Sequence, residues 1–586
     1  MCNKIIYLVQ NNGKEVYMKD KKIIILSIIG SLLLVSIVVA TSYAYFVANV
    51  SGNKDTNNGV VTNGVMALEY KDGDAINLGN AIPGSSVSKT FTVKHTGNVS
   101  TNYTIYFSEL SNKFVDKTDL VYTLTSSDGG KNVAQTQVPS TNAAMVSNYA
   151  IDAGKTHTYT LTITFLNKDE NQNDNMNVSF TTKVSINETK EYLDIDVELA
   201  QGMIPVKFDV DGNAVVADTN SEWYDYSNHE WANAVLVNCA DSEIKSKYFD
   251  SNNKVLTSAV GKTISMDEIM QMYVYIPRYK YQLFNAEDGT SNPQAINITF
   301  ESKTTAKSTG SRNGEWLTHP AFTFGDKELA GIWVGKFETS NTSALPKIVP
   351  NVSSLRSMNV SAQFNTSRLM TTTLVSTYGT STNDDSHMMK NMEWGAVAYL
   401  TNSIYGRYTN ASTCIASGCE VWINNNSSYT TGCAGSSVSA SSASTCNAWN
   451  TATGVNASTT GNIYGVYDMS GGALEYVMGN YNDTIKNAGF SSMPEAKYYD
   501  KYTGTDSNSD FTKYHLGDAT KETLKAKSTG QNAWYQDSSY SVNSSYPWVR
   551  RGGNYNNSTF AGVFYFYISD GNSYGNFSFR VVLGAL

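Results

Sequence analysis

Charged side chains are scarce in this chain of 586 residues, because Asp, Glu, Lys and Arg together make up only 16% of it. The 52 acidic residues outnumber the 43 basic ones, which gives a formal net charge of -9 at pH 7. A surface that neutralises phosphates needs the opposite sign, so we expect no nucleic-acid partner. At about 150 residues per domain, the length predicts three or four units. Long stretches of Ser, Thr, Asn and Gly favour an extracellular, β-rich protein over a cytosolic enzyme.

Catalytic motifs are also missing from the sequence. The six histidines are scattered and form no H-E-x-x-H zinc motif, and no phosphate-binding G-x-x-x-x-G-K occurs. A G-x-S-x-G string is present at residues 571–575, but a hydrolase of that type needs a later histidine, and none follows His515. We therefore interpret the string as a glycine-rich loop and predict no catalytic residue, no metal ligand and no enzyme activity.

One segment rich in Ser, Thr and Ala contains four of the six cysteines, Cys414, Cys419, Cys433 and Cys446. None of their spacings is the C-x2-C pair typical of zinc sites, and no histidine lies among them. Local disulfides are therefore the favoured interpretation for an exported protein, and four cysteines allow three pairings.

No cofactor is predicted, with structural calcium left as an open alternative at Asp209–Asn213. A calcium loop of the EF-hand type needs a glutamate at its twelfth position, where this chain has Asn220. A tight turn is therefore the favoured interpretation of this run.

The N-terminal region carries an apolar run, Ile23–Ala40, which follows three lysines at positions 19, 21 and 22. This order of a charged and an apolar segment is typical of an export signal. Its roughly 18 residues also reach the lower limit for a helix that spans a bilayer. We interpret residues 1–46 as an export signal or, if uncleaved, a membrane anchor, and residues 1–17 as an upstream extension or an incorrectly assigned start. The predicted location is extracellular or on the cell surface.

Apolar residues recur at every second position in Ser88–Lys94 and in Thr158–Phe165. This period predicts strands with one buried face, and several such runs separated by turn signals indicate an antiparallel β-sandwich over residues 47–190. Together with Ala40–Phe46 and Phe91–Gly97, the segment resembles the biofilm-fibre and camelysin-like family. The resemblance implies an immunoglobulin-like fold. Members of that family can donate an N-terminal strand to the next subunit, so self-association is one alternative, and a monomeric spacer domain is the favoured one. Residues 191–267 are expected to form a β-rich connecting region.

Four stretches in the C-terminal half carry a second resemblance. They are Met272–Pro277, Gly331–Ser340, Tyr464–Tyr476, and Arg550–Gly553 with Ser578–Leu583. In this order they are similar to the formylglycine-generating-enzyme (sulfatase-modifying-factor) family, which implies an α+β, C-type-lectin-like fold over residues 268–586. The arginines are expected to fork onto buried carboxylates such as Glu475. The motif residues with an expected structural role are Glu393, Trp394, Asp468, Glu475, Arg551, Gly552, Gly553, Phe579 and Arg580.

The chemistry of that family depends on copper held by two cysteines, one of them shortly after the Arg-Gly-Gly segment. In this chain Asn554–Asn557 intervene without a cysteine, and none occurs beyond Cys446. The resemblance therefore implies the scaffold without the oxidase chemistry, and a degenerate oxidase is the less favoured alternative.

The tail between Gly553 and Arg580 lacks Lys, Glu, Gln, Met and Trp. Its Tyr, Ser, Thr, Phe, Ile, Asp and Gly are all reachable from an asparagine codon by changing adenines alone. Residues 554–578 thus resemble the variable regions that diversity-generating retroelements write into receptors of C-type-lectin fold. The alternative, an ordinary asparagine-rich loop, has equal weight.

Alternation within Val563–Tyr567 places Phe564 and Phe566 on one face and Tyr565 and Tyr567 on the other. With the phenylalanines inward, we expect the tyrosines to project outward as in an antibody paratope. The predicted function is a surface-displayed or secreted protein that binds or adheres to a protein or glycan on another cell, phage or host surface. The alternative is a subunit of an extracellular fibre. The predicted ligand-binding residues are Tyr555, Phe560, Tyr565, Tyr567, Ile568, Ser569, Asp570, Asn572, Tyr574, Asn576 and Phe577.

Overall fold

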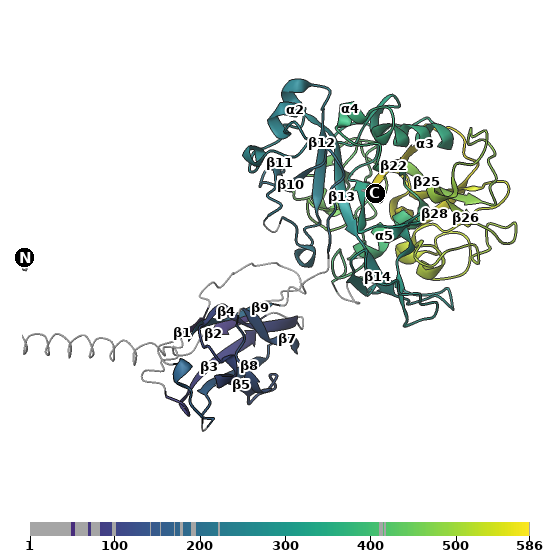
Figure 1. Cartoon of the computed structure of the whole chain (residues 1–586). Coiled ribbons are helices and arrows are strands. Elements are labelled where there is room, and N and C mark those ends of the chain that lie inside the picture. Colours follow the sequence, from purple (N-terminus) through teal and green to yellow (C-terminus); the bar gives the residue numbers. More distant parts are fainter. Residues whose placement is uncertain are drawn as a thin grey trace, which may run out of the picture. The chain divides into compact units, whose positions relative to one another are not determined.

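The chain folds into two compact units, divided between Tyr192 and Leu193, in the computed structural model (Figure 1). Its described residues are 49–52, 68–71, 82–96, 101–140, 142–152, 154–168, 170–175, 180–188, 195–220, 223–409, 414 and 418–584. The expected export signal over residues 1–46 lies outside them. No helix within the described ranges is long and apolar enough to cross a bilayer.

The first unit consists of two β-sheets. The five-stranded sheet has the order β2-β3-β8-β5-β6, and the four-stranded sheet has the order β1-β9-β4-β7. Their strands are β1 (Asn49–Gly52), β2 (Leu68–Lys71), β3 (Ser86–His95), β4 (Thr101–Asn112), β5 (Leu120–Ser126), β6 (Val133–Gln137), β7 (Ala143–Ile151), β8 (Thr156–Phe165) and β9 (Phe180–Glu188).

Both alternating runs of the sequence form strands, β3 and β8, which pair antiparallel with each other. Along β8 every second side chain is buried, so that Tyr159, Leu161 and Ile163 face the interior. They share one core with Tyr103 and Ile105 of the other sheet. Burying an aliphatic or aromatic side chain stabilises a fold by about 1.5–3 kcal/mol. The apolar faces of the two sheets therefore hold this unit together.

Strand β1 lies at the edge of the four-stranded sheet and pairs in parallel with β9 of the same unit. The other strand pairs among the described residues of this unit are antiparallel. The N-terminal strand thus joins its own sheet as an added parallel edge strand.

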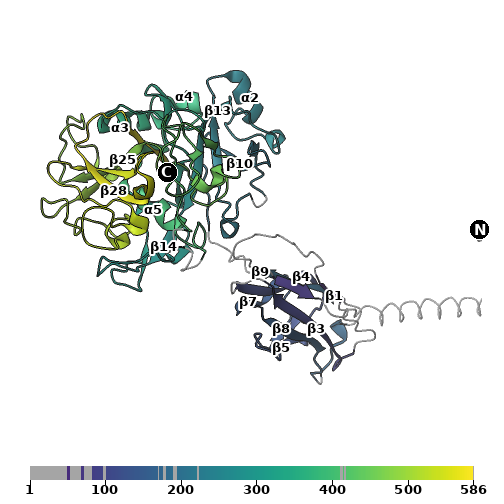
Figure 2. The same cartoon turned by 180° about the vertical axis from the view of Figure 1, so that it is seen from behind.

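The second unit is built on two larger sheets. The seven-stranded sheet, in the order β11-β10-β12-β13-β19-β30-β22, contains β10 (Ile204–Phe208), β11 (Ala214–Val216), β12 (Asn233–Val237), β13 (Ile269–Pro277), β19 (Gly331–Gly335), β22 (Asp385–Met388) and β30 (Val581–Gly584). The other runs β26-β25-β27-β28, with β29 beside β25, and contains β25 (Leu474–Tyr481), β26 (Asp500–Tyr502), β27 (Trp548–Gly552), β28 (Gly562–Ser569) and β29 (Phe577–Phe579). In Figure 2 strands β10 and β13 of one sheet lie on one side of the unit, and strands β25 and β28 of the other sheet lie on the opposite side.

Smaller elements complete the second unit. The α-helices whose bounds lie within its described residues are α2 (Ser242–Tyr248), α3 (Val360–Arg368), α4 (Val375–Tyr378) and α5 (Asn391–Thr401). A three-stranded sheet contains β14 (Tyr279–Gln282), β15 (Ile298–Phe300) and β16 (Trp316–Thr318). The paired short strands are β17 (Thr323–Phe324), β18 (Lys327–Glu328), β20 (Ser340–Thr342), β21 (Leu345–Lys347), β23 (Cys433–Ala434) and β24 (Asn447–Ala448). The described part of the chain is therefore β-rich, with few and short helices.

The segment 191–267 differs from the connecting region expected from the sequence. Its strands β10, β11 and β12 extend the seven-stranded sheet, and β12 pairs antiparallel with β13. All five residues of β12, Asn233–Val237, are buried, because both faces of this strand are covered. The segment therefore belongs to the core of the second unit.

Helix α5 connects the core to the C-terminal tail. The carboxylate of Glu393 accepts a hydrogen bond from the backbone N–H of Lys390 at 2.8 Å, which stabilises the start of the helix. One residue later, the indole N–H of Trp394 donates to the carbonyl of Val563 in β28 at 2.8 Å. All eleven residues of the helix are buried. The Glu-Trp pair therefore starts the helix and fixes the position of β28.

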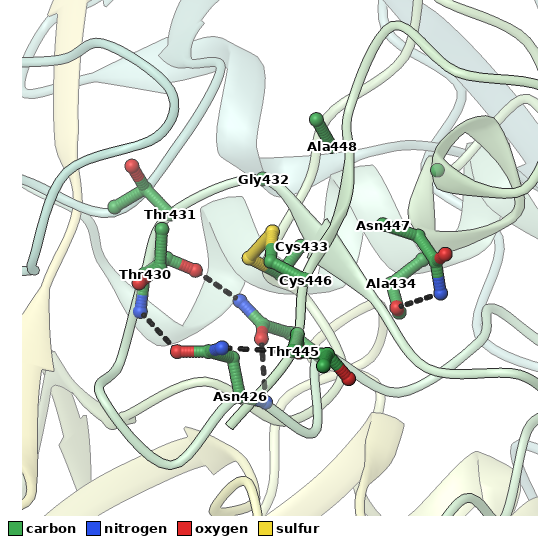
Figure 3. The surroundings of a disulfide bond; sticks show 12 residues. Asn426, Thr430, Thr431, Gly432, Cys433, Ala434, Thr445, Cys446, Asn447 and Ala448 are labelled. Atoms are coloured by element: carbon green, nitrogen blue, oxygen red, sulfur yellow. Dashed lines mark hydrogen bonds between the residues drawn. A yellow bond between two sulfur atoms is a disulfide. The ribbon is translucent and has the colours of Figure 1, made fainter. Parts of the chain in front are cut away.

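Two disulfides form within the cysteine-rich segment, Cys414–Cys419 and Cys433–Cys446. The second joins β23 to the residue just before β24, and Figure 3 shows its surroundings. There the Asn426 amide donates to the carbonyl of Thr445 at 3.1 Å and ties the loop to a neighbouring turn. Of the three pairings allowed by the sequence, the fold thus selects the one that joins neighbours in the chain.

Candidate ligand-binding hollow

Strand β28 forms the edge of its sheet in the C-terminal tail and carries the two tyrosines singled out in the sequence. Its residue Tyr567 lies directly opposite Arg550 of β27, so the two side chains are neighbours on one face. Tyr565, two residues earlier, lies on the same face. The backbone of β27 and β28 therefore brings an arginine and two tyrosines together.

A hollow of about 280 Å³ opens over this face. It is lined by aromatic and neutral polar side chains together with one arginine. The lining residues are Gln531, Ser538, Tyr540, Arg550, Asn557, Phe560, Tyr565 and Tyr567.

The free edge of β28 is covered by the segment around Ser539. Phe566 donates its N–H to the carbonyl of Ser538, and Tyr540 donates to the carbonyl of Phe566, both at 3.0 Å. This pairing places the Tyr540 ring beside the Tyr567 ring, with 4.1 Å between their centroids. The segment thus satisfies the edge of the sheet and supplies one wall of the hollow.

The aromatic rings of the hollow are ordered by stacking. The rings of Tyr565 and Tyr567 are nearly parallel, with an interplanar angle of 19° and 6.0 Å between centroids. Burial raises the pKa of Tyr565 to about 12, and burial together with the neighbouring Tyr540 raises the pKa of Tyr567. Both phenols are therefore neutral at physiological pH and keep their O–H donors.

Arg550 is the cation of the hollow. Its guanidinium carbon lies 4.5 Å from the ring centroid of Tyr567 and 5.0 Å from that of Phe577, so two ring faces hold it. Its Nε is buried and has no hydrogen-bond partner. Within the described part of the chain, Arg550 forms no ion pair with a carboxylate. Its positive charge is therefore uncompensated and lies at the wall of an aromatic hollow.

The predicted outward projection of the tyrosines is wrong for Tyr565, which is only 4% exposed, whereas Tyr567 is partly exposed. The alternation itself holds, because Phe564 packs against Trp534 on the opposite face with ring centroids 5.0 Å apart. The tyrosine face is covered because the segment around Tyr540, which precedes the tail, and Phe560, just before β28, lie against it. The tyrosines consequently form the wall of a hollow and not a projecting surface.

Only three of the eleven predicted ligand-binding residues, Phe560, Tyr565 and Tyr567, line the hollow. Ser569 and Phe577 are buried, and the Ser569 hydroxyl lies 2.7 Å from the hydroxyl of Tyr476. These two side chains therefore belong to the core.

The other predicted residues do not line the hollow. Asp570 accepts hydrogen bonds from the Tyr574 hydroxyl at 3.0 Å and from the Asn572 backbone at 3.1 Å, which closes a turn on itself. Tyr555 packs edge-on against Tyr429 with 4.9 Å between ring centroids. Ile568 and Asn576 are partly buried.

Five lining residues were missed by reasoning from the sequence: Gln531, Ser538, Tyr540, Arg550 and Asn557. Asn557 lies within the candidate variable region. The other four precede it, and three of those come from irregular segments without periodicity. For Arg550 a signal did exist, because neighbouring residues of a strand point to opposite faces. In the Arg550-Arg551 pair, only one arginine can therefore enter the core.

The buried arginines of the scaffold have different partners. Arg580 forks onto Glu475, with its Nη2 2.6 Å and its Nε 3.2 Å from the two carboxylate oxygens, as expected. Arg551 does not share this carboxylate, which corrects the sequence-based expectation. Its guanidinium donates to the carbonyls of Ala519 and Val563, because Arg580 occupies both oxygens of Glu475.

Three buried carboxyl groups, Glu338, Asp468 and Glu475, surround the single cation Arg580. Burial raises the pKa of all three, and against the opposing effect of Arg580 the pKa of Glu475 is still raised to about 7. The Gly472 backbone, with φ of +66°, passes so close that a Cβ there would lie 2.5 Å from a Glu338 oxygen. The turn at Asp468–Gly472 thus closes around this cluster.

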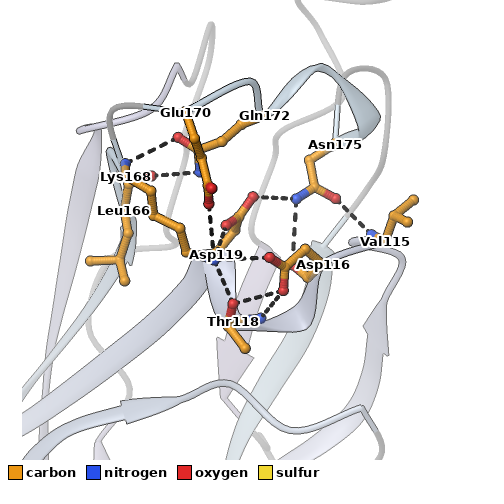
Figure 4. A network of polar contacts seen from close by, with 9 residues as sticks. All are labelled: Val115, Asp116, Thr118, Asp119, Leu166, Lys168, Glu170, Gln172 and Asn175. Carbon is orange, nitrogen blue, oxygen red and sulfur yellow. Dashed lines mark hydrogen bonds and ion pairs between the residues drawn. The ribbon is translucent and has the colours of Figure 1, made fainter.

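An acidic cluster in the first unit has the geometry of a cation site but already contains a cation (Figure 4). The Lys168 ammonium lies 2.6 Å from an Asp119 oxygen, 2.9 Å from Asp116 and 4.0 Å from Glu170. These contacts raise the pKa of Lys168, while hydrogen bonds from Lys168 and Thr118 lower that of Asp116 to about 2. The cluster is therefore an ion-pair network.

The open calcium alternative at Asp209–Asn213 takes the form of a tight turn. The Asp209 carboxylate accepts backbone hydrogen bonds from Asp211 at 3.0 Å and from Asn213 at 2.8 Å. Its oxygens thus stabilise the connection between β10 and β11.

Neither family models nor curated proteins match this sequence.

Proposed function

We propose that this chain is an exported, surface-displayed ligand-binding protein and that the hollow beside β28 is its binding site. One observation carries the proposal. The hollow combines four aromatic rings, three neutral polar side chains and the uncompensated cation of Arg550. Such concave sites, with aromatic walls and a few polar groups that fix orientation, are typical of ligand recognition.

The second unit is proposed to be a C-type-lectin-like scaffold of the formylglycine-generating-enzyme type that lacks the copper chemistry. The buried positions of three motif stretches, in β13, β19 and β27, support this assignment. The Glu393-Trp394 helix start and the Arg580–Glu475 pair support it as well. The cysteines of residues 414–446 form disulfides, and none follows the Arg-Gly-Gly segment.

Retroelement diversification of residues 554–578 is part of the same proposal. Half of the lining residues, Asn557, Phe560, Tyr565 and Tyr567, fall within this region. Each is of a type that adenine changes in an asparagine codon reach or preserve. The lining residues from 531–550 would then keep a constant sequence, and the lining residues from the tail would be diversified.

The first unit is proposed to be an immunoglobulin-like spacer behind an export signal or anchor. Its two sheets around one core support this assignment. The ligand that the second unit binds would be a protein or a glycan on another cell, phage or host surface.

Arrays of glycans and peptides probed with the full chain test the binding function. We expect defined signals that Tyr567→Ala reduces at least tenfold, as for an aromatic residue at the centre of a site. Tyr514→Ala is the matched control, because Tyr514 is also a partly buried tyrosine with a cation, Lys521, 4.3 Å from its ring centroid. Equal binding by wild type and Tyr567→Ala would refute the proposal.

A fibre subunit is the second candidate function. The parallel edge pairing of β1 with β9 favours it, because the same pairing could be made by a strand from a neighbouring copy. Such a fibre predicts oligomers that resist sodium dodecyl sulfate and disappear when residues 45–60 are deleted. Monomers in both samples would rule it out.

A further inference from the structure

We propose that the hollow recognises a sugar that bears a carboxylate, of the uronic-acid or sialic-acid type, and that Arg550 determines this specificity. The inference rests on the proposed binding function of the hollow and adds the chemical class of the ligand.

The charge of Arg550 gives the first argument. Some arginines of the second unit have a carboxylate partner, such as Arg368 with Asp385 at 2.6 Å and Arg278 with Glu301 at 3.2 Å, whereas Arg551 donates to backbone carbonyls. Arg550 has none among the described residues, although part of its guanidinium is removed from water. A buried guanidinium nitrogen without a hydrogen-bond partner is costly, and no Asp or Glu lines the hollow. An anionic ligand would supply the missing charge.

The planar shape of the guanidinium indicates which class of anion it would bind. The rings of Tyr567 and Phe577 hold the guanidinium 4.5 and 5.0 Å from their centroids and so restrict its orientation. A planar group fixed in this way matches a planar carboxylate through two parallel hydrogen bonds.

The remaining lining residues favour a sugar over an acidic peptide. The partly exposed Tyr567 and the exposed Phe560 offer apolar ring surface for the C–H groups of a pyranose, and Gln531, Ser538 and Asn557 offer partners for hydroxyl groups. A peptide would be expected to add a strand to the free edge of β28. That edge is already paired with residues 538–540 through two backbone hydrogen bonds.

The volume sets the size of the ligand group. About 280 Å³ lies just below the range of about 300–1,000 Å³ that is usual for drug-sized ligands. The hollow therefore takes one or two sugar rings, and the rest of a glycan would extend into solvent.

Titration calorimetry on the full chain tests the inference with two pairs of probes that differ in the carboxylate. The pairs are methyl glucuronide against methyl glucoside, and sialyllactose against lactose. We expect at least one acidic probe to bind about tenfold or more tightly than its neutral counterpart. Arg550→Gln should abolish this preference, and Arg550→Lys should retain part of it because the charge remains without the fork.

Two further variants separate recognition from folding. Gln531 is exposed, so Gln531→Ala should leave the fold intact and weaken binding of the acidic probe several-fold. Arg312 is exposed and does not line the hollow, so Arg312→Gln should bind as wild type.

Several results would overturn the inference. They are equal affinity for acidic and neutral probes, an acid preference that survives Arg550→Gln, binding of an oligoglutamate in place of the sugars, or no binding of any of the four sugars at millimolar concentration. If array binding still depends on Tyr567, such results refute the acidic-sugar class and leave the binding function standing. If array binding does not depend on Tyr567, the proposed function fails as well.

Discussion

The Arg580→Met substitution removes the only arginine among three buried carboxyl groups, and its effect can be worked out from the structure. Arg580 is fully buried and binds both oxygens of Glu475. It also donates to the carbonyls of Gly335 at 2.7 Å and Tyr467 at 2.9 Å. Breaking a buried ion pair on one side costs about 3–5 kcal/mol, because the remaining charge is left without a partner. We expect a loss of at least this size in the free energy of unfolding of the second unit.

The loss should depend on pH. The folded-state pKa of Glu475 is raised from 4.5 to about 7, so its protonation stabilises the fold below pH 4.5, and this contribution disappears as the pH rises through 7. Without Arg580 the carboxylates repel each other more strongly when ionised. The variant should therefore lose more stability at pH 8 than at pH 5.

Urea unfolding followed by tryptophan fluorescence measures this unit alone, because all nine tryptophans of the chain lie in residues 223–548. The double variant Arg580→Met/Glu475→Gln should recover part of the loss, since it removes the unpaired charge. A loss below about 1 kcal/mol, an absence of recovery in the double variant, or an equal loss at both pH values would refute the reasoning.

Three more predictions concern other parts of the fold. Cys433→Ser removes the disulfide to Cys446, which closes a loop of 13 positions. It should lower the free energy of unfolding of the second unit, measured in urea, by about 2–4 kcal/mol. An unchanged midpoint of urea unfolding would contradict this prediction. Leu161→Ala in the core of the first unit should cost about 2–5 kcal/mol, measured by tyrosine fluorescence and checked against Val115→Ala, a substitution of an exposed residue. Burial alone would lower the pKa of His387, but its two carboxylate neighbours raise it to about 9. Its charged form therefore stabilises the fold below pH 6.5, and this contribution is lost as the pH rises through 9. His387→Gln should flatten the stability profile between pH 7 and 10, and an unchanged slope would exclude this role.

Local patterns in the sequence were sufficient for several elements. The period of two in Thr158–Phe165 produced β8, because alternate side chains of a strand necessarily face opposite sides. The polar run Asp209–Asn213 produced a tight turn, because an aspartate side chain caps the backbone two and four residues later. Neighbouring cysteines produced local disulfides for a similar reason, since a short loop holds their sulfur atoms close together.

The site could be predicted only in part, because each wall comes from a different region of the chain. The alternation of Phe564 and Tyr565 along β28 was readable, and the tertiary structure kept it. Whether the tyrosine face meets water depends on residues outside β28 such as Tyr540, whose contact with Tyr567 no local period predicts.

What the sequence determined by itself was therefore the direction in which each side chain of a strand points, along with the β-rich character and the turns. The tertiary structure decided what lies opposite each face. It joined residues 195–267 to the main sheet, assigned Glu475 to Arg580 instead of Arg551, and left Arg550 without an acidic partner among the described residues. The physical reason is that side-chain direction follows from the backbone of a few neighbouring residues, whereas burial and charge pairing depend on segments that meet only after the chain has folded.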